Sequence, residues 1–419
     1  MSSSPPAFTP QLDKSTAKPS QQIPAFDLFV VGTGGGPDET NLSGYLLKAH
    51  EQMWSDGIVG VEAGSGLGAL KRILAKKQAN PFASVANVSG PSAAEIYSYI
   101  RTYLISHAHL DHVLSLVLLA GSFGGPRKSI RGSRDCLEDL QSIFKPSRIW
   151  PNLASWNPED ADHLYLYDPI LPIGELPSKK KKGPTQDESE NEENSTYYTP
   201  LHGPLTVCMF PISHGPSYDS SAFFIRHTSL GREFLFFGDV EYDLSSINPR
   251  ISNVWSAAAP KFVSGELSAV FIECSWPSGR PNEKMFGHLT PEHLVAELQV
   301  LANFVSEHRN LSNNYPASTN PRVTSISPRR RSSSSASPER KRLKQSVDED
   351  PSEGGRRPVL QNALSGLRVY IIHCKEELTR QDNTQPINQV ISNQVRELVN
   401  KLELGAEIVA AEQGSLIHI

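Results

Sequence analysis

Three histidines and one aspartate lie within six consecutive positions of this chain, at His107, His109, Asp111 and His112. Neutral imidazole nitrogens and carboxylate oxygens are ligands that suit zinc, with manganese or iron as alternatives. Four ligands this close in sequence cannot all reach one tetrahedral ion without backbone strain, so we expect them to serve two adjacent cations. Two-cation sites are used to hydrolyse phosphoesters. The simpler alternative is a solvated loop beside a helix start, with Asp111 as the cap.

The flanking residues indicate how this string is positioned. Residues 97–105 end in an aromatic and β-branched run that predicts a buried strand, and residues 113–119 are an apolar stretch that predicts a helix. The histidines therefore lie on a loop between a strand and a helix.

Three more candidate ligands stand beside other predicted elements. His214 follows a predicted strand at 207–212, Asp239 follows one at 234–238, and His288 precedes a predicted helix at 291–305. An aspartate directly after a buried apolar strand is expensive to desolvate unless it meets a cation or another partner. These three residues are therefore predicted to complete the site.

A glycine-rich segment, with Gly32 and residues 34–36, follows a predicted strand at 26–31. Such a loop can bind a dinucleotide phosphate when a helix opens directly after the glycines. Here Pro37 and polar residues follow instead. We therefore expect a tight loop that brings backbone close to the active site.

Two segments have a composition that cannot support a core, and both interrupt a series of predicted strands and helices. They span residues 178–195 and 312–358, and a polar tail covers 1–24. Because strand patterns resume after each segment, we predict one catalytic domain over 25–419 with two disordered insertions. Strands that alternate with helices, with antiparallel pairs among them, predict an α/β sandwich with helices outside two packed sheets.

The bulk composition narrows the cellular setting and the partners. A net charge of −5 argues against stable nucleic-acid binding, and four cysteines far apart in sequence favour a reducing compartment. No apolar run is long enough to cross a membrane, so a cytoplasmic protein is expected. Basic clusters at 329–331 and 340–344 indicate a nuclear-import signal, a nucleic-acid patch or a solvated disordered insertion. The oligomeric state stays open, with a homodimer as one option.

The order of these motifs resembles the metallo-β-lactamase superfamily, whose fold is an αββα sandwich. Within that superfamily, the string from His107 to Leu116 is similar to the signature of class II 3′,5′-cyclic-nucleotide phosphodiesterases of the fungal low-affinity type. Further matching pieces are Trp150-Pro-Asn152, Phe237-Gly-Asp239 and Gly287-His-Leu-Thr-Pro291. One departure is Ala120-Gly121, which lies inside the following predicted helix and away from any ligand.

The resemblance implies a role for each candidate residue. The first cation would be bound by His107, His109 and His214. The second would be bound by Asp111, His112 and His288, with Asp239 bridging both. His373, after a predicted strand at 367–372, would lie near the substrate phosphate as a hydrogen-bond donor or acid. Glu273 would orient a ligand histidine.

The reaction implied by the resemblance is hydrolysis of cAMP, and of cGMP as a further substrate, to the 5′-nucleotide, which ends a cyclic-nucleotide signal. Two divalent cations, zinc first, are the expected cofactors. One alternative is a tRNA 3′-end endonuclease of the same fold, although Ile272 stands before Glu273 where that family has histidine. Another is an inactive scaffold, against which the retention of all seven ligands argues. Trp150, Trp276 and Phe286 are candidates either for stacking on a purine or for the core.

Overall fold

The structure is a computed structural model, and it describes residues 23–173, 198–314 and 360–419, apart from residues 78, 86, 123, 146–148, 161, 377 and 379–383. The two predicted insertions at 178–195 and 312–358 lie outside the described residues, except that residues 312–314 end a helix. The predicted tail at 1–24 also lies outside them, except for its last two residues.

Two mixed sheets form the centre of the molecule. The first has the strand order β15-β1-β2-β3-β4-β5-β7-β6. Its bounds in chain order are β1 Phe26–Gly32, β2 Gly44–Ala49, β3 Ile58–Ala63, β4 Ile100–Leu104, β5 Lys128–Arg131, β6 Ala154–Ser155, β7 Tyr165–Tyr167 and β15 Leu416–His418. The second sheet has the order β14-β13-β12-β11-β10-β9-β8. Its strands are β8 Thr199–His202, β9 Leu205–Ser213, β10 Asp219–His227, β11 Arg232–Phe237, β12 Leu267–Glu273, β13 Arg368–Ile372 and β14 Glu407–Ala410.

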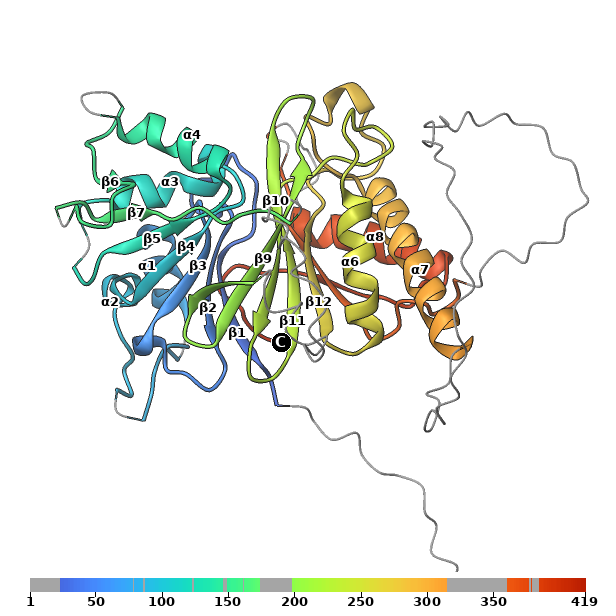
Figure 1. Ribbon diagram of the computed structural model, residues 1–419, viewed down its shortest axis with the longest axis horizontal. Coiled ribbons are helices and arrows are strands. Elements are labelled where there is room, and N and C mark those ends of the chain that lie inside the picture. Colours follow the sequence, from blue (N-terminus) through green and yellow to red (C-terminus); the bar gives the residue numbers. More distant parts are fainter. Residues whose placement is uncertain are drawn as a thin grey trace, which may run out of the picture.

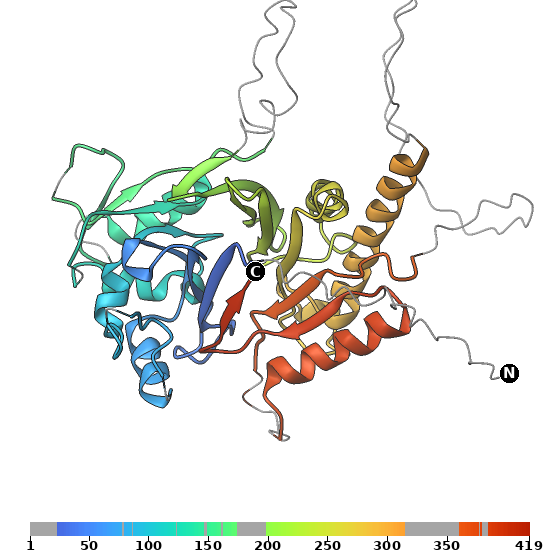
Figure 2. The ribbon, with the colours of Figure 1, turned by 90° about the horizontal axis from the view of Figure 1, so that it is seen from below.

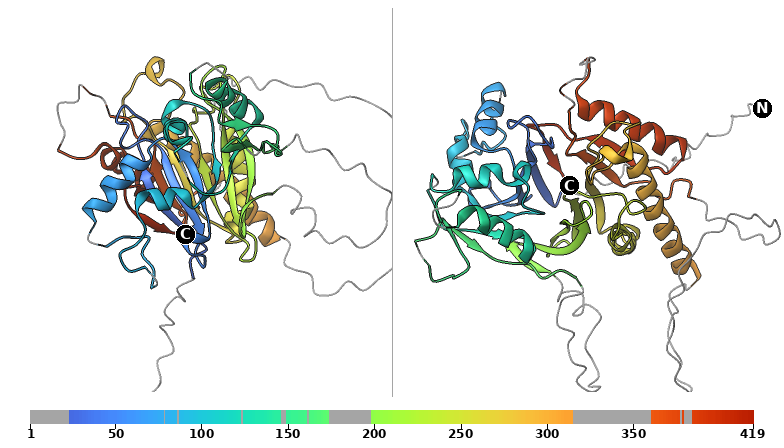
Figure 3. Two further views of the ribbon diagram at one scale, coloured as in Figure 1. Left: turned by 90° about the vertical axis from the view of Figure 1, so that its left-hand side faces the viewer. Right: turned by 90° about the horizontal axis from the view of Figure 1, so that it is seen from above.

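Helices cover the outer face of each sheet, so the predicted αββα sandwich is confirmed (Figure 1). The helices on the first sheet are α1 Leu67–Lys76, α2 Ala93–Ser98, α3 Leu110–Leu119 and α4 Arg134–Phe144. Those on the second are α6 Ile251–Val263, α7 Pro291–Asn314 and α8 Ile387–Lys401. Short 3-10 turns lie at Trp54–Asp56 and Asn282–Lys284. Two further views show the same layers from the side and from above (Figure 3).

Side-chain alternation along the strands explains the layers. In β1, Leu28 and Val30 pack between the two sheets, whereas Phe29 and Val31 pack against the helices. Strand β11 does the same on the other side, where Phe236 faces the first sheet and Phe237 faces the helices. Strands buried on both faces read as continuous apolar runs, which is the pattern that these segments have in the sequence.

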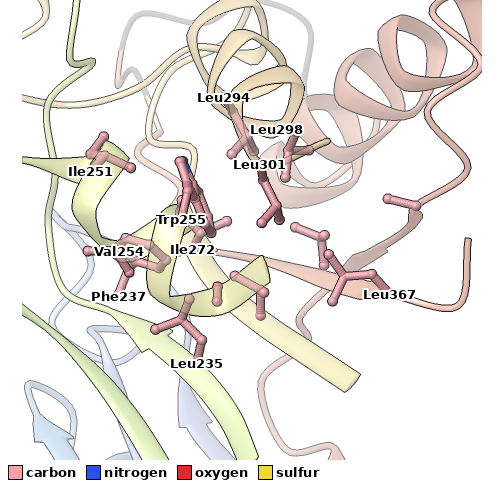
Figure 4. Packing of buried hydrophobic residues seen from close by; sticks show 14 of the residues in the cluster. Leu235, Phe237, Ile251, Val254, Trp255, Ile272, Leu294, Leu298, Leu301 and Leu367 are labelled. Atoms are coloured by element: carbon pink, nitrogen blue, oxygen red, sulfur yellow. The ribbon is translucent and has the colours of Figure 1, made fainter. Parts of the chain in front are cut away.

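The core outside the second sheet centres on Trp255 of α6. Its ring lies 5.0 Å from the ring of Phe237, and leucines of α7 surround it (Figure 4). The indole nitrogen donates a hydrogen bond to Glu297 at 3.1 Å, so the polar atom of this buried ring is satisfied.

Chain segments far apart in sequence meet at the edge of the first sheet. Strand β15, near the end of the chain, pairs antiparallel with β1, as Figure 2 shows for the dark red and blue strands. Within the sheets, β3 runs parallel to β4, and β11, β12 and β13 run parallel to one another. Strands that run in the same direction end at the same edge, which places their carboxyl ends together.

Two predicted elements are present, but one boundary of each was wrong. The strand predicted at 97–105 begins at Ile100, because Tyr97 and Ser98 belong to α2, whose start is fixed by a capping box between Ser92 and Glu95. The helix predicted at 291–305 continues to Asn314. Among the described helices, none combines the length and the apolar character needed to cross a lipid bilayer.

Candidate metal centre

The predicted ligands come from both sheets. His107 and His109 lie on the loop between β4 and α3, with Asp111 and His112 in the first turn of α3. In the second sheet, His214 directly follows β9, and Asp239 stands two residues after β11. Both strands pair antiparallel with β10, so they run in the same direction and end at the same edge. The two sheets therefore bring these residues together from opposite sides.

Asp239 lies at the centre of the cluster and is 2% exposed. Its Oδ2 atom is 3.7 Å from Nε2 of His107 and 3.6 Å from Nε2 of His214. Its Oδ1 atom is 3.2 Å from Nε2 of His112 and 3.3 Å from Nε2 of His373. Each carboxylate oxygen thus faces a different pair of histidines.

The first group consists of His107, His109, His214 and Asp239, whose ligand atoms all lie within 4.8 Å of one another. Nε2 of His107 is 3.0 Å from Nδ1 of His109. The other nitrogens face protein oxygens, since Nδ1 of His107 is 2.9 Å from the Ser106 hydroxyl and Nδ1 of His214 is 2.8 Å from the Gly287 carbonyl. These contacts orient each ring so that one nitrogen faces its neighbours.

The second group consists of Asp111, His112, Asp239 and His373. Nε2 of His373 lies 2.9 Å from Nε2 of His112 and 3.2 Å from Oδ2 of Asp111. Behind His112, its Nδ1 atom is 3.3 Å from Oε2 of Glu62 at the end of β3. From the sequence, His288 was expected in this group and His373 beside the substrate. In the structure His373 lies among these ligand atoms, and it also forms a further group with His288 and Glu273.

His288 lies next to the second group, paired with a buried carboxylate. Its Nδ1 atom is 2.9 Å from Oε1 of Glu273 and 3.8 Å from Oδ2 of Asp239. Glu273 also accepts hydrogen bonds from the Val240 amide at 2.8 Å and from the Ser275 hydroxyl. Glu273 is therefore placed to orient the His288 ring.

Backbone geometry at this centre is unusual at two residues. Glu62 has φ 55° and His373 has φ 56°, in the left-handed region that non-glycine residues seldom adopt. The predicted close approach of the glycine-rich loop is confirmed beside His373. A Cβ atom on Gly35 would lie 2.4 Å from Cε1 of the His373 ring, so a glycine is required at this position.

The donor set fits divalent cations. Oδ1 of Asp239 has no hydrogen-bond donor although it is buried, and a buried carboxylate oxygen needs a compensating positive charge. Burial lowers the pKa of His107 well below its usual value, and it also lowers the pKa of His109 and of His214. Neutral imidazole is the form that binds metal.

In and beside the second group, the pKa values depend on burial and on the nearby carboxylates. Burial lowers the pKa of His373 to about 4, and burial likewise brings that of His288 to about 4. Burial alone would lower the pKa of His112. The negative charges of Asp239 and Glu62 outweigh this effect and hold the pKa well above its usual value. Burial and the neighbouring Asp239 raise the pKa of Glu273 to about 7. A bound cation would take over the charge compensation that His112 provides to Asp239.

A separate His/Asp cluster does not fit a cation as well. It joins Asp27, His50 and His418 at the edge of the first sheet. Both imidazoles lie 2.7 Å from Oδ1 of Asp27, and the Lys48 ammonium forms a salt bridge with Oδ2. Both carboxylate oxygens are therefore satisfied, and the ammonium already supplies the positive charge.

Several residues at the centre escaped the sequence analysis. Glu62, which faces His112 from β3, was given no role. The ring of Tyr218 stacks on His109 at 4.7 Å, and Nζ of Lys375 lies 3.4 Å from Oδ2 of Asp111. Tyr218 follows the predicted ligand His214 by four positions, and Lys375 follows the predicted catalytic residue His373 by two, which is the one signal that could have found them.

The aromatic candidates for base stacking differ in exposure. Phe286 is 70% exposed on the turn before His288, with φ 54°. Trp276 is partly buried, with Arg280 over its ring at 3.4 Å, and Trp150 packs partly buried against the core beneath α1–α4.

Comparison with known proteins gives a consistent result. Residues 31–317 match the family described as cAMP phosphodiesterases class-II. The 3′,5′-cyclic-nucleotide phosphodiesterase of Schizosaccharomyces pombe is 30% identical over 305 residues, which cover 68% of this chain and 77% of that protein. The Aliivibrio fischeri enzyme of the same name is 29% identical over 287 residues, covering 67% and 77%. The crystal structure of unliganded yeast PDE1 is similar over 95% of this chain and 100% of that chain, with a TM-score of 0.65 and 18% identity. The metallo-β-lactamase-like fold expected from the sequence is therefore confirmed.

Proposed function

The chain belongs to the class II cAMP phosphodiesterase family, and on that premise we propose that it hydrolyses 3′,5′-cyclic nucleotides, with cAMP as the first substrate, at a two-cation site around Asp239. The observation that carries this proposal is the division of the Asp239 carboxylate, whose two oxygens face two different histidine pairs. Such a carboxylate is suited to bridge two cations. Among the alternatives weighed from the sequence, the tRNA endonuclease and the inactive scaffold have no comparable support.

The two groups define the ligands in this proposal. His107, His109 and His214 hold the first cation, and Asp111, His112 and His373 hold the second, with Asp239 between them. We assign zinc to both positions because imidazole and carboxylate together suit it. When bound, two divalent cations offset the negative charge of a phosphodiester and make a water molecule acidic enough to attack near neutral pH.

His288 and Glu273 form a pair that is suited to proton transfer. Hydrolysis adds the oxygen of a water molecule to phosphorus, breaks the bond between phosphorus and O3′, and leaves a proton on O3′. Because Nδ1 of His288 is committed to Glu273, Nε2 is the ring atom that remains for the substrate. We therefore assign to His288 the proton-carrying role that the sequence analysis assigned to His373.

The single domain predicted over 25–419 agrees with this assignment. The loop after β4 of the first sheet supplies His107 and His109, and the segments after β9, β11 and β13 of the second supply His214, Asp239 and His373. Neither sheet holds a complete ligand set, so we propose that both sheets act as one catalytic unit.

The decisive experiment combines metal analysis with product analysis on the purified full-length chain. We expect close to two zinc ions per chain and conversion of cAMP to 5′-AMP, with cGMP as a parallel substrate and a tRNA precursor as a negative control. A strong chelator should abolish hydrolysis. Protein that carries two cations but leaves both cyclic nucleotides intact would contradict the proposed function.

A further inference from the structure

Lys375 brings a positive charge to the metal centre. It lies two residues after His373, and its side chain is 16% exposed. Nζ donates a hydrogen bond to the Gly35 carbonyl at 2.6 Å and lies 3.4 Å from Oδ2 of Asp111. Within the part of the chain that the structure describes, it is the one ammonium or guanidinium group in ion-pair distance of the carboxylates of Glu62, Asp111, Asp239 and Glu273.

The position of Lys375 is built into the fold. Its backbone amide donates to the Ser275 carbonyl at 2.8 Å, and the preceding Cys374 carbonyl accepts from the Gly35 amide at 3.2 Å. The segment after β12 and the glycine-rich loop therefore hold the backbone at Cys374 and Lys375 from two sides. This fixed backbone sets the point from which the Lys375 side chain reaches the ligand set.

A purely structural role leaves the charge unexplained. The glycine-rich loop is already held by backbone hydrogen bonds from Gly34 to Asn41 at 2.7 Å and from Gly35 to Cys374. An ammonium group beside a site that accepts two cations is repelled by them unless anions lie close by. Of the four carboxylates named above, that of Asp111 lies in ion-pair distance of Lys375, and His373 shares the same Oδ2 atom. A further anion would balance the charge, and the phosphate of the substrate is one.

The donor count of the ammonium group supports the same conclusion. A lysine ammonium has three N–H donors, and Gly35 and Asp111 account for two of them. Among the residues that the structure describes, Gly35 and Asp111 are its two acceptors, so the third donor can meet an oxygen that arrives next to Asp111, where the second cation is proposed to lie.

We propose that the Lys375 ammonium binds a non-bridging oxygen of the cyclic phosphate and stabilises the charge that builds on it during hydrolysis. This inference rests on the proposed function, and it makes Lys375 a catalytic residue in addition to the ligands. Groups that are fixed in advance near developing negative charge lower the barrier because they do not have to reorganise.

The first test compares Lys375→Met with Lys76→Met, a substitution at an exposed lysine on α1. We expect Lys375→Met to keep two cations per chain and to lose on the order of tenfold to a hundredfold in kcat/KM for cAMP. Calorimetry should show weaker binding of the product 5′-AMP to the metal-loaded protein, and a smaller dependence of that binding on salt. Lys375→Arg, which keeps the charge, should retain part of both activity and binding.

A second test uses chemical rescue. Lys375→Ala leaves space for a small cation, so methylammonium should restore part of the turnover, whereas tetramethylammonium, which has no N–H donor, should not. A result for Lys375→Met equal to that of Lys76→Met in both hydrolysis and AMP binding would overturn the phosphate contact. Loss of one cation in Lys375→Met would instead show that the residue acts only through Asp111. A wild-type chain that does not hydrolyse cyclic nucleotides would contradict the proposed function, which is a distinct result.

Discussion

Nε2 of His373 lies 3.3 Å from Oδ1 of Asp239, the same carboxylate oxygen that faces His112. His288 approaches Asp239 from the other side, with Nδ1 at 3.8 Å from Oδ2, and its shorter contact is with Glu273. The two histidines therefore have different surroundings although both follow strands of the second sheet. This difference decides which of them is proposed as a ligand and which as a proton carrier.

Substitution of each histidine separates these roles. We expect His373→Ala to retain about one cation per chain, because it removes a nitrogen from the second group. His288→Ala should retain both cations and lose turnover, with an altered pH profile of kcat. Metal analysis and steady-state hydrolysis of cAMP on both variants are the measurements. The opposite pattern, with a cation lost only in His288→Ala, would restore the assignment made from sequence.

Removal of the central carboxylate should affect both cations. Asp239→Asn preserves the shape of the side chain but removes its charge, so we expect less than one cation per chain. The rate should fall by at least about a hundredfold, since 1.36 kcal/mol of barrier is tenfold in rate. Asp135→Asn, at an exposed position on α4, is the matched control. Retention of both cations and near-normal turnover in Asp239→Asn would show that this residue does not bridge.

The glycine-rich loop offers a steric test. In Gly35→Ala the new methyl group would meet the His373 ring at 2.4 Å, so we expect displacement of that ring, weaker binding of one cation and a loss of activity of about tenfold or more. Gly68→Ala is the control, because no atom lies within 4 Å of a Cβ there and alanine favours helix α1 by up to about 1 kcal/mol. Normal metal content and turnover in Gly35→Ala would mean that the loop can move away from His373 freely.

The buried Glu297 predicts a pH dependence of stability. It accepts hydrogen bonds from the Asp243 amide at 3.0 Å and from Trp255, and burial raises its pKa from 4.5 to about 7. Because the pKa in the folded state is higher than in the unfolded chain, the stabilisation is complete below about pH 4.5 and is lost as the pH rises towards 7. The loss amounts to about 3 kcal/mol at 1.36 kcal/mol per pKa unit.

Glu297→Gln removes this titration. The free energy of unfolding of the wild-type chain, relative to this variant, should therefore fall between pH 4.5 and pH 7. Chemical denaturation at several pH values measures it, with Glu292→Gln at an exposed site of α7 as the control. If the wild-type and Glu297→Gln curves ran parallel, the raised pKa of Glu297 would be wrong.

The arrangement of layers could be predicted from the sequence because the strands are buried on both faces. Short apolar runs such as 26–31 and 234–237 are typical of strands that are covered on one face by the other sheet and on the other face by helices. The boundary at Ile100 could not be predicted from the apolar run alone, since the capping box of Ser92 and Glu95 extends a helix into it. Local hydrogen bonding outweighed strand propensity at Tyr97 and Ser98.

At the site, the sequence by itself indicated the ligand types and most of the positions proposed to supply them, because a dense string of histidines and a buried aspartate after a strand are each costly without a cation or another partner. Only the tertiary structure decided that His373 joins Asp111 and His112, that Glu273 pairs with His288, and that Glu62 and Lys375 flank the centre. The physical reason is that these contacts join residues of different strand ends and both sheets. Their distances depend on how the two sheets pack and on backbone angles such as the positive φ of His373, which no local pattern of residues encodes.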